Sequence, residues 1–136
     1  MSTRSKARKA ALDLLYESDI RKTQASALMR SRITDLEYVI RDFTQELVSG
    51  VESNRRKIDE LIATYSQGWD MDRMPVIDRN ILRLAMYEIL WSNDVPQAVV
   101  INEAVELAQT LSTDESSKYI NGVLSKVVEI KPDLVL

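Results

Sequence analysis

The chain has 136 residues, of which 45% are hydrophobic, and a formal net charge of −3. This length is typical of one domain with its own core, and we expect a single domain over residues 1–136. The sequence contains no cysteine and no histidine, which excludes disulfides, cysteine nucleophiles and the commonest general base and metal ligand. Three glycines and three prolines are too few for the turns of an all-β fold, so we predict an all-α protein.

The charge is unevenly distributed along the chain. Arg4, Lys6, Arg8 and Lys9 lie within the first nine residues without an acidic neighbour, so the rest of the chain carries a net charge of −7. A basic N-terminus on an acidic body predicts two partners of different character. No apolar run approaches the length of a membrane span and the N-terminal residues do not resemble a signal peptide, so we expect a cytoplasmic protein.

Apolar residues recur at helical spacing through most of the chain. The first predicted helix carries the basic cluster on its first turns, where positive charge opposes the helix dipole. Gly50, inside the third helix, indicates a close crossing with a neighbouring helix. Ser112 and Glu115 form a capping-box pattern before the last helix. The predicted helices cover residues 3–18, 25–32, 36–53, 55–65, 75–91, 98–111 and 115–130.

The helix predicted over residues 75–91 has apolar residues around most of its circumference, which indicates burial on several sides. Arg79 and Arg83 share one face of it, and neither has a carboxylate three or four residues away. Their partner must therefore come from another segment or from another molecule. Arg79 is the better candidate for contact with a ligand, whereas Arg83, one turn deeper, either does the same or pairs with a carboxylate of a packed neighbour.

The sequence does not contain the set of groups that an enzyme needs. No Gly-x-Ser-x-Gly turn, glycine-rich phosphate loop or metal-type spacing occurs, so we predict no enzymatic activity, no cofactor and no metal. Binding fits better, because Arg79 and Arg83 would form one cationic surface with Lys118 and the N-terminal cluster if their three helices meet. Tyr119 offers a stacking face and Asn121 an amide for a base edge, which suits single-stranded RNA. A tyrosine at helical spacing is more often part of the core, however, and an asparagine more often packs or forms a local hydrogen bond.

Four segments together resemble the NusB family of transcription antitermination factors. They are KARKAALDLLY at residues 6–16, ILRLAMYEIL at 81–90, INEAVELA at 101–108 and SKYINGVL at 117–124. The resemblance extends over essentially the whole chain, and several spaced motifs in the same order make it specific. It implies a compact bundle of about seven helices that binds the boxA element of ribosomal RNA leader transcripts together with NusE, a small-subunit ribosomal protein. It further implies that this complex joins RNA polymerase and suppresses premature termination.

The resemblance also implies where these partners bind. RNA contacts are expected on the N-terminal arm and at the start of the last helix, with Arg79 added because of its unpaired charge. The predicted RNA-binding residues are Arg4, Lys6, Arg8, Lys9, Arg79, Lys118, Tyr119 and Asn121. The predicted contacts with NusE are Tyr16, Tyr87 and Glu88. Ser5 stands where relatives often carry an arginine, which predicts modest RNA affinity in the absence of NusE.

Two alternative interpretations are open. The same fold occurs as the RNA-binding domain of rRNA cytosine-5 methyltransferases, whose chains continue into a cofactor-binding domain with a catalytic cysteine, whereas this sequence has no cysteine. The second alternative is a homodimeric interaction protein that buries its basic surface between two copies. RNA that dissociates such a dimer would imply that RNA and the second copy share one surface.

Overall fold

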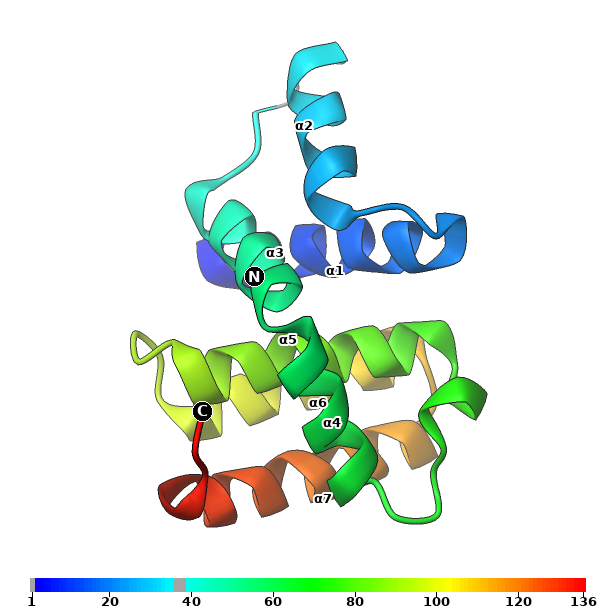
Figure 1. Cartoon of the computed structure of the whole chain (residues 1–136), viewed down its shortest axis with the longest axis vertical. Coiled ribbons are helices and arrows are strands. Elements are labelled where there is room, and N and C mark those ends of the chain that lie inside the picture. The colour runs from blue at the N-terminus through cyan, green and yellow to red at the C-terminus, as the bar shows by residue number, and fades with distance from the viewer. Residues whose placement is uncertain (1, 36–38) are drawn as a thin grey trace.

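The computed structural model describes residues 2–35 and 39–136, and these form seven α-helices and two short 3-10 helices (Figure 1). The α-helices are α1 (Thr3–Arg21), α2 (Ala25–Asp35), α3 (Asp42–Ser53), α4 (Arg55–Tyr65), α5 (Val76–Trp91), α6 (Gln97–Leu111) and α7 (Asp114–Ile130). The 3-10 helices are η1 (Met71–Arg73) and η2 (Lys131–Asp133). The described residues contain no strand, which confirms the predicted all-α fold. None of the described helices is both long and apolar enough to cross a membrane.

Helices α4 to α7 begin and end within one residue of the predicted bounds. Helix α1 runs past its predicted end to Arg21, and the next residue, Lys22, closes it in a left-handed conformation (φ 57°). The predicted start of α3 at Leu36 lies outside the described residues, and the helix begins at Asp42. The predicted capping box is wrong, because Ser112 ends α6 by donating its amide to the Ala108 carbonyl (2.8 Å). The hydroxyl of Thr113 caps α7 in its place.

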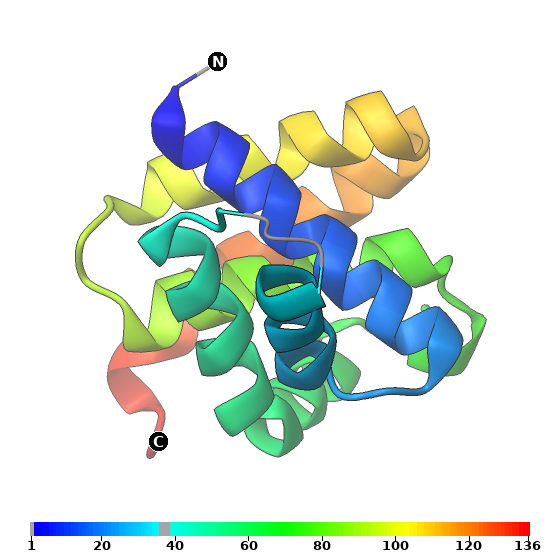
Figure 2. The same ribbon diagram turned by 90° about the horizontal axis from the view of Figure 1, so that it is seen from above.

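Helix α5 lies at the centre of the molecule and packs against α1, α3, α4, α6 and α7. Figure 1 shows α1 and α2 above it and α7 below it, and Figure 2 shows α1 running between α6 and the pair α2 and α3. Every residue of α5 from Asn80 to Met86 is buried, so the predicted burial on several sides is confirmed. The polar members of this helix therefore need partners inside the protein.

Gly50 allows α3 to approach α5 closely. A Cβ atom built on Gly50 would lie 2.1 Å from Cε1 of Tyr87, a distance that no side chain could occupy unless the tyrosine ring moved. The predicted close crossing at Gly50 is thus confirmed. The Tyr87 ring therefore lies against the backbone of α3 at Gly50. The same ring also stacks on Trp91 (centroids 6.4 Å apart, planes inclined by 12°).

Candidate nucleic-acid interface

The basic residues of the first helix do not share one environment. Arg4 and Lys6 are exposed, and neither forms an ion pair with a described residue. The Arg4 guanidinium lies 5.1 Å from the centre of the Phe43 ring, a cation–π contact that leaves its charge unneutralised. Lys9 is partly neutralised, because its ammonium donates to both oxygens of Asp13, one turn along the helix (2.7 and 2.9 Å). Arg4 and Lys6 are therefore the free charges of this cluster.

Arg8 faces the interior, with 3% of its surface exposed, so its expected place on an exposed arm is wrong. Its Nε donates to Glu88 Oε2 (2.7 Å) and its Nη2 to Glu88 Oε1 (2.9 Å), and Nη1 lies 3.4 Å from Glu103 Oε1. Burial disfavours the charged guanidinium, but the hydrogen bonds and charge of Glu88 outweigh burial and raise the pKa of Arg8. Glu88 is itself 2% exposed, so it does not lie on a surface where NusE could bind.

The two arginines of α5 pair with carboxylates from other helices. Arg79 donates to both oxygens of Asp19 at the end of α1 (2.8 and 3.0 Å). Arg83 donates to the same carboxylate (2.9 Å) and, through Nε, to Asp59 of α4 (2.9 Å). Of the two sources that the sequence left open, another segment or another molecule, the structure shows another segment for both arginines. Asp19, which pairs with Arg79, lies about 22 Å from Arg4 along α1. Arg79 therefore does not extend the N-terminal cluster of basic residues.

The first turns of α7 present a second group of predicted residues. Lys118 and Asn121 are exposed there, whereas Tyr119 is half-buried. The hydroxyl of Tyr119 donates to the Gln67 carbonyl, and its ring meets Trp69 edge-on (centroids 4.4 Å apart, planes inclined by 62°). Tyr119 thus packs against the core on one side and borders a pocket on the other, while its role as a stacking face for RNA stays a prediction.

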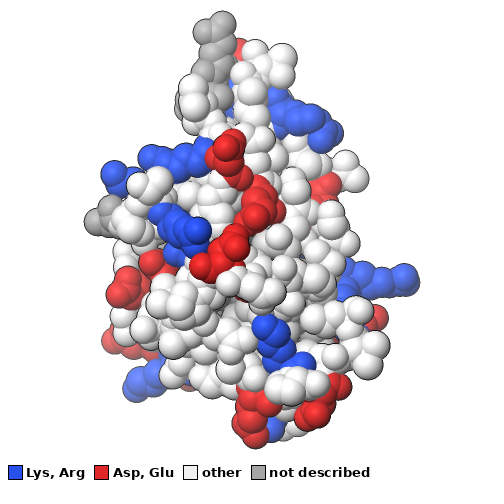
Figure 3. All heavy atoms as spheres, turned by 90° about the vertical axis from the view of Figure 1, so that its left-hand side faces the viewer, with Lys and Arg blue, Asp and Glu red and all other residues white. Residues whose placement is uncertain are grey.

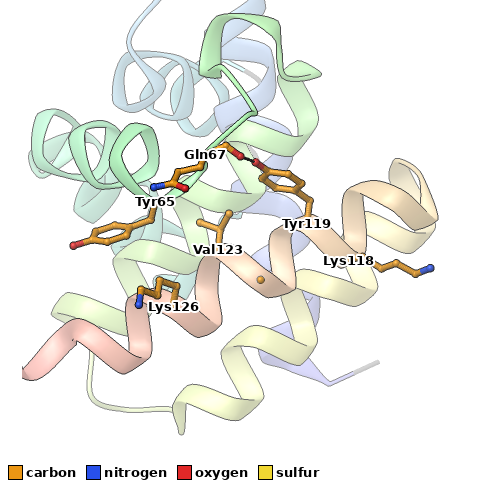
Figure 4. A pocket seen from close by; sticks show the side chains of 7 residues that line it. Tyr65, Gln67, Lys118, Tyr119, Val123 and Lys126 are labelled. Atoms are coloured by element: carbon orange, nitrogen blue, oxygen red, sulfur yellow. Dashed lines mark hydrogen bonds between the residues drawn. The ribbon is translucent and has the colours of Figure 1, made fainter.

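This pocket has a volume of about 610 Å³ and opens between the end of α4 and the outer face of α7 (Figure 4). Tyr65, Gln67 and Lys126 line it together with Tyr119, and Lys118 stands at its rim and extends away from Tyr119. Aromatic rings, an amide and ammonium groups are the components that bind a base and its phosphate. The sequence does not indicate Tyr65, Gln67 and Lys126 as neighbours of Tyr119, because only the packing of α4 against α7 brings them together.

The two groups of basic residues lie toward opposite ends of α5. The Arg8–Glu88 pair holds the start of α1 near the end of α5, and the Ser116 hydroxyl donates to Asp78 (2.7 Å), which holds the start of α7 at the beginning of α5. Asp78 and Glu88 are about 15 Å apart along that helix. The predicted single cationic surface is therefore wrong. On the face shown in Figure 3, Lys and Arg side chains lie beside a band of Asp and Glu and do not form a continuous basic area.

Of the three predicted contacts with NusE, Tyr16 alone is exposed, with 40% of its surface accessible. Ile20 follows one helical turn later on the same face of α1 and is 54% exposed. Ile20 is not among the residues predicted from the sequence, although its spacing of one turn from Tyr16 places it on the same helix face. An exposed tyrosine beside an exposed isoleucine is a surface suited to protein binding.

Comparison with known proteins gives consistent matches over nearly the full chain. The model of the NusB family matches residues 5–129. The transcription antitermination protein NusB of Thermobifida fusca is 48% identical over 134 residues, which cover 98% of this chain and 94% of that protein. The solved structure of NusB from T. maritima has a TM-score of 0.82 and 31% identity, covering 98% of this chain and 99% of that one. A chain from a crystal structure of the antitermination factors NusB and NusE in complex with dsRNA has a TM-score of 0.80 and 25% identity, covering 93% and 96%.

Proposed function

Because this chain belongs to the NusB family of transcription antitermination proteins, which are not enzymes, we propose that it binds boxA RNA of ribosomal RNA leader transcripts together with NusE. In this function it joins RNA polymerase and counteracts premature termination. The proposal is supported by the similarity to a NusB chain solved with NusE and dsRNA. Within this chain, the observation that carries it is the pair of unneutralised charges on Arg4 and Lys6.

Arg4 and Lys6 lie on the first turns of α1, where positive charge opposes the helix dipole and no described carboxylate compensates it. Such an arrangement costs stability in the free protein and becomes favourable when a phosphate backbone approaches. Lys118 provides a further exposed ammonium on α7, and the pocket beside Tyr119 provides a place where a base can stack.

The proposal is tested by titrating boxA RNA and a scrambled RNA at two salt concentrations, with and without NusE. We expect steeply salt-dependent binding that NusE strengthens for boxA, because phosphate contacts release counterions and base contacts supply sequence preference. Binding that is insensitive to both salt and NusE would contradict the proposal.

The double substitution Arg4→Ala and Lys6→Ala is expected to weaken boxA and scrambled RNA to the same extent, because phosphate contacts carry no sequence information. The slope of log Kobs against log salt should fall by about 1.4, that is about 0.7 for each lost phosphate contact with a single strand. The matched control is Arg56→Ala, which removes an exposed arginine of α4 and should leave the slope unchanged. An unchanged slope in the double variant would remove these residues from the interface.

For the second partner, we expect Tyr16→Ala combined with Ile20→Ala to weaken binding to NusE about tenfold or more, since exposed aromatic anchors dominate protein interfaces. Isothermal titration calorimetry with NusE in the absence of RNA measures this loss directly. The control is Val99→Ala, which shortens an apolar side chain on α6 that is 42% exposed. Equal affinities for NusE in the wild type and the double variant would place the NusE surface elsewhere.

A further inference from the structure

A groove of about 500 Å³ lies between the start of α1 and the outer face of α6. Its lining consists of Ser5 and Lys9 of α1 and, from α6, Glu103, Glu106, Leu107, Thr110 and Leu111. Neither the predicted RNA-binding residues nor the predicted NusE contacts include a residue of α6. The groove nevertheless lies between the two sites that the proposed function assigns to RNA.

The contacts of α6 define this position. At one end of the groove, the Ser5 hydroxyl donates to Glu103 Oε1 (2.5 Å), immediately beside the exposed Arg4 and Lys6. The groove continues for about 10 Å along α6 to Thr110. Helix α6 then ends at Leu111, and α7 begins at Asp114 and carries Lys118 on its second turn. An RNA strand that follows α6 from Arg4 and Lys6 to Lys118 therefore crosses the groove.

The two carboxylates of the groove differ in their environment. Glu103 accepts from Ser5 and lies 3.4 Å from Arg8 Nη1, so its charge is compensated within the protein. Glu106 is exposed and has no hydrogen-bond or ion-pair partner among the described residues. A free carboxylate repels phosphate and accepts hydrogen bonds from amino groups of bases. The ammonium that lines the groove, that of Lys9, is partly neutralised by Asp13. The backbone of the strand is therefore favoured at the basic ends, and a base is favoured in the groove.

The neighbours of Glu106 restrict which base fits. Leu107 and Leu111 are one helical turn apart and form an apolar wall, of which Leu111 is 38% exposed. Thr110 is one turn from Glu106 on the same face, and its hydroxyl can donate to an acceptor beside the amino group. An amino group next to a ring-nitrogen acceptor is the Watson–Crick edge of cytosine and adenine, whereas guanine has a ring N–H beside its amino group, which cannot accept from Thr110. Uracil carries a carbonyl in place of that amino group and an N–H in place of the acceptor.

We propose that the groove between α1 and α6 binds one cytosine or adenine base of the RNA, with its amino group donating to Glu106 and its ring nitrogen accepting from Thr110. This inference rests on the proposed RNA-binding function. It makes Glu106 and Thr110 residues that determine sequence specificity, whereas Arg4 and Lys6 contribute affinity for the backbone.

The test uses boxA RNAs in which each cytidine is replaced by uridine, or each adenosine by purine riboside, one position at a time. Binding is measured to the wild type, to Glu106→Ala and to the matched control Glu60→Ala, which removes an exposed glutamate of α4. With the wild type and with the control, we expect one position where loss of the amino group weakens binding about 5- to 100-fold. With Glu106→Ala, the purine riboside change should cause no further loss, because the two changes remove one shared contact. The uridine change should cause a smaller loss than in the wild type, because uridine also lacks the ring-nitrogen acceptor for Thr110.

Losses that are additive at every position overturn the inference, while tight binding of unmodified boxA RNA to the wild type still supports the proposed function. Failure of unmodified boxA RNA to bind the wild type, with or without NusE, overturns both. A position where Glu60→Ala removes the effect as completely as Glu106→Ala also overturns the inference, since it would show that general charge, and not the groove, determines the preference.

Discussion

Replacement of Arg8 by alanine is expected to lower the free energy of unfolding by about 3 to 5 kcal/mol, because it leaves the buried Glu88 carboxylate without its partner. Arg8 stands in a sequence that resembles an RNA-binding arm, yet its guanidinium forms a two-bonded fork with Glu88 inside the protein. Urea unfolding followed by circular dichroism measures the loss.

Two further variants test the cause of that loss. Arg4→Ala removes a neighbouring but exposed arginine and should leave the free energy of unfolding unchanged within error. Arg8→Met combined with Glu88→Leu should recover much of the stability, since an apolar pair of similar volume leaves no buried charge. If Arg8→Ala instead kept full stability and lost RNA affinity with the salt dependence of a phosphate contact, Arg8 would belong to the surface.

Replacement of Asp19 by alanine is expected to have a comparable effect, about 3 to 5 kcal/mol, because Asp19 joins α1 to three residues of α5. It accepts hydrogen bonds from Arg79 (2.8 Å), Asn80 (2.9 Å) and Arg83 (2.9 Å). Without it, Arg83, whose side chain is 6% exposed, retains a single acidic partner among the described residues, which is Asp59. The same denaturation measurement applies, and Asp133→Ala, which removes an exposed aspartate near the C-terminus, is the control.

The stability supplied by Asp19 should depend on pH in a defined direction. Burial alone would raise the pKa of Asp19, but hydrogen bonds from Arg79 and Asn80 and the charges of Arg83 and Arg79 outweigh it and hold that pKa well below its usual range. The unfolded chain therefore binds the proton more readily than the folded one, so the contribution is complete above about pH 5 and is lost as the pH falls toward the folded pKa. In Asp19→Ala this part of the acid dependence should be absent. An identical acid profile in the wild type and the variant would contradict the assignment.

Local patterns in the sequence determined the helical fold and much of its layout. Helical spacing and turn residues depend on neighbours a few positions away, and for this reason α4 to α7 lie within one residue of their predicted bounds. Apolar residues around most of the circumference of the helix at residues 76–91 predicted its burial on several sides, and Gly50 predicted a close crossing with a neighbouring helix. The order of the motifs was sufficient to indicate the family, which the comparisons confirm.

Only the tertiary structure decided which charged residues are free to bind a partner. Arg8 lies at helical spacing from the buried Ala11, Leu12 and Leu15, a sign of inward orientation that the concentration of positive charge around it obscured. Its partner Glu88 is 80 residues away, and Asp19 is 60 residues from Arg79. Whether a cation is paired depends on which carboxylate the packing of distant helices brings within hydrogen-bonding distance. Helical periodicity carries no information about such long-range contacts, so the sequence showed where the charges are, and the fold determined which of them remain available.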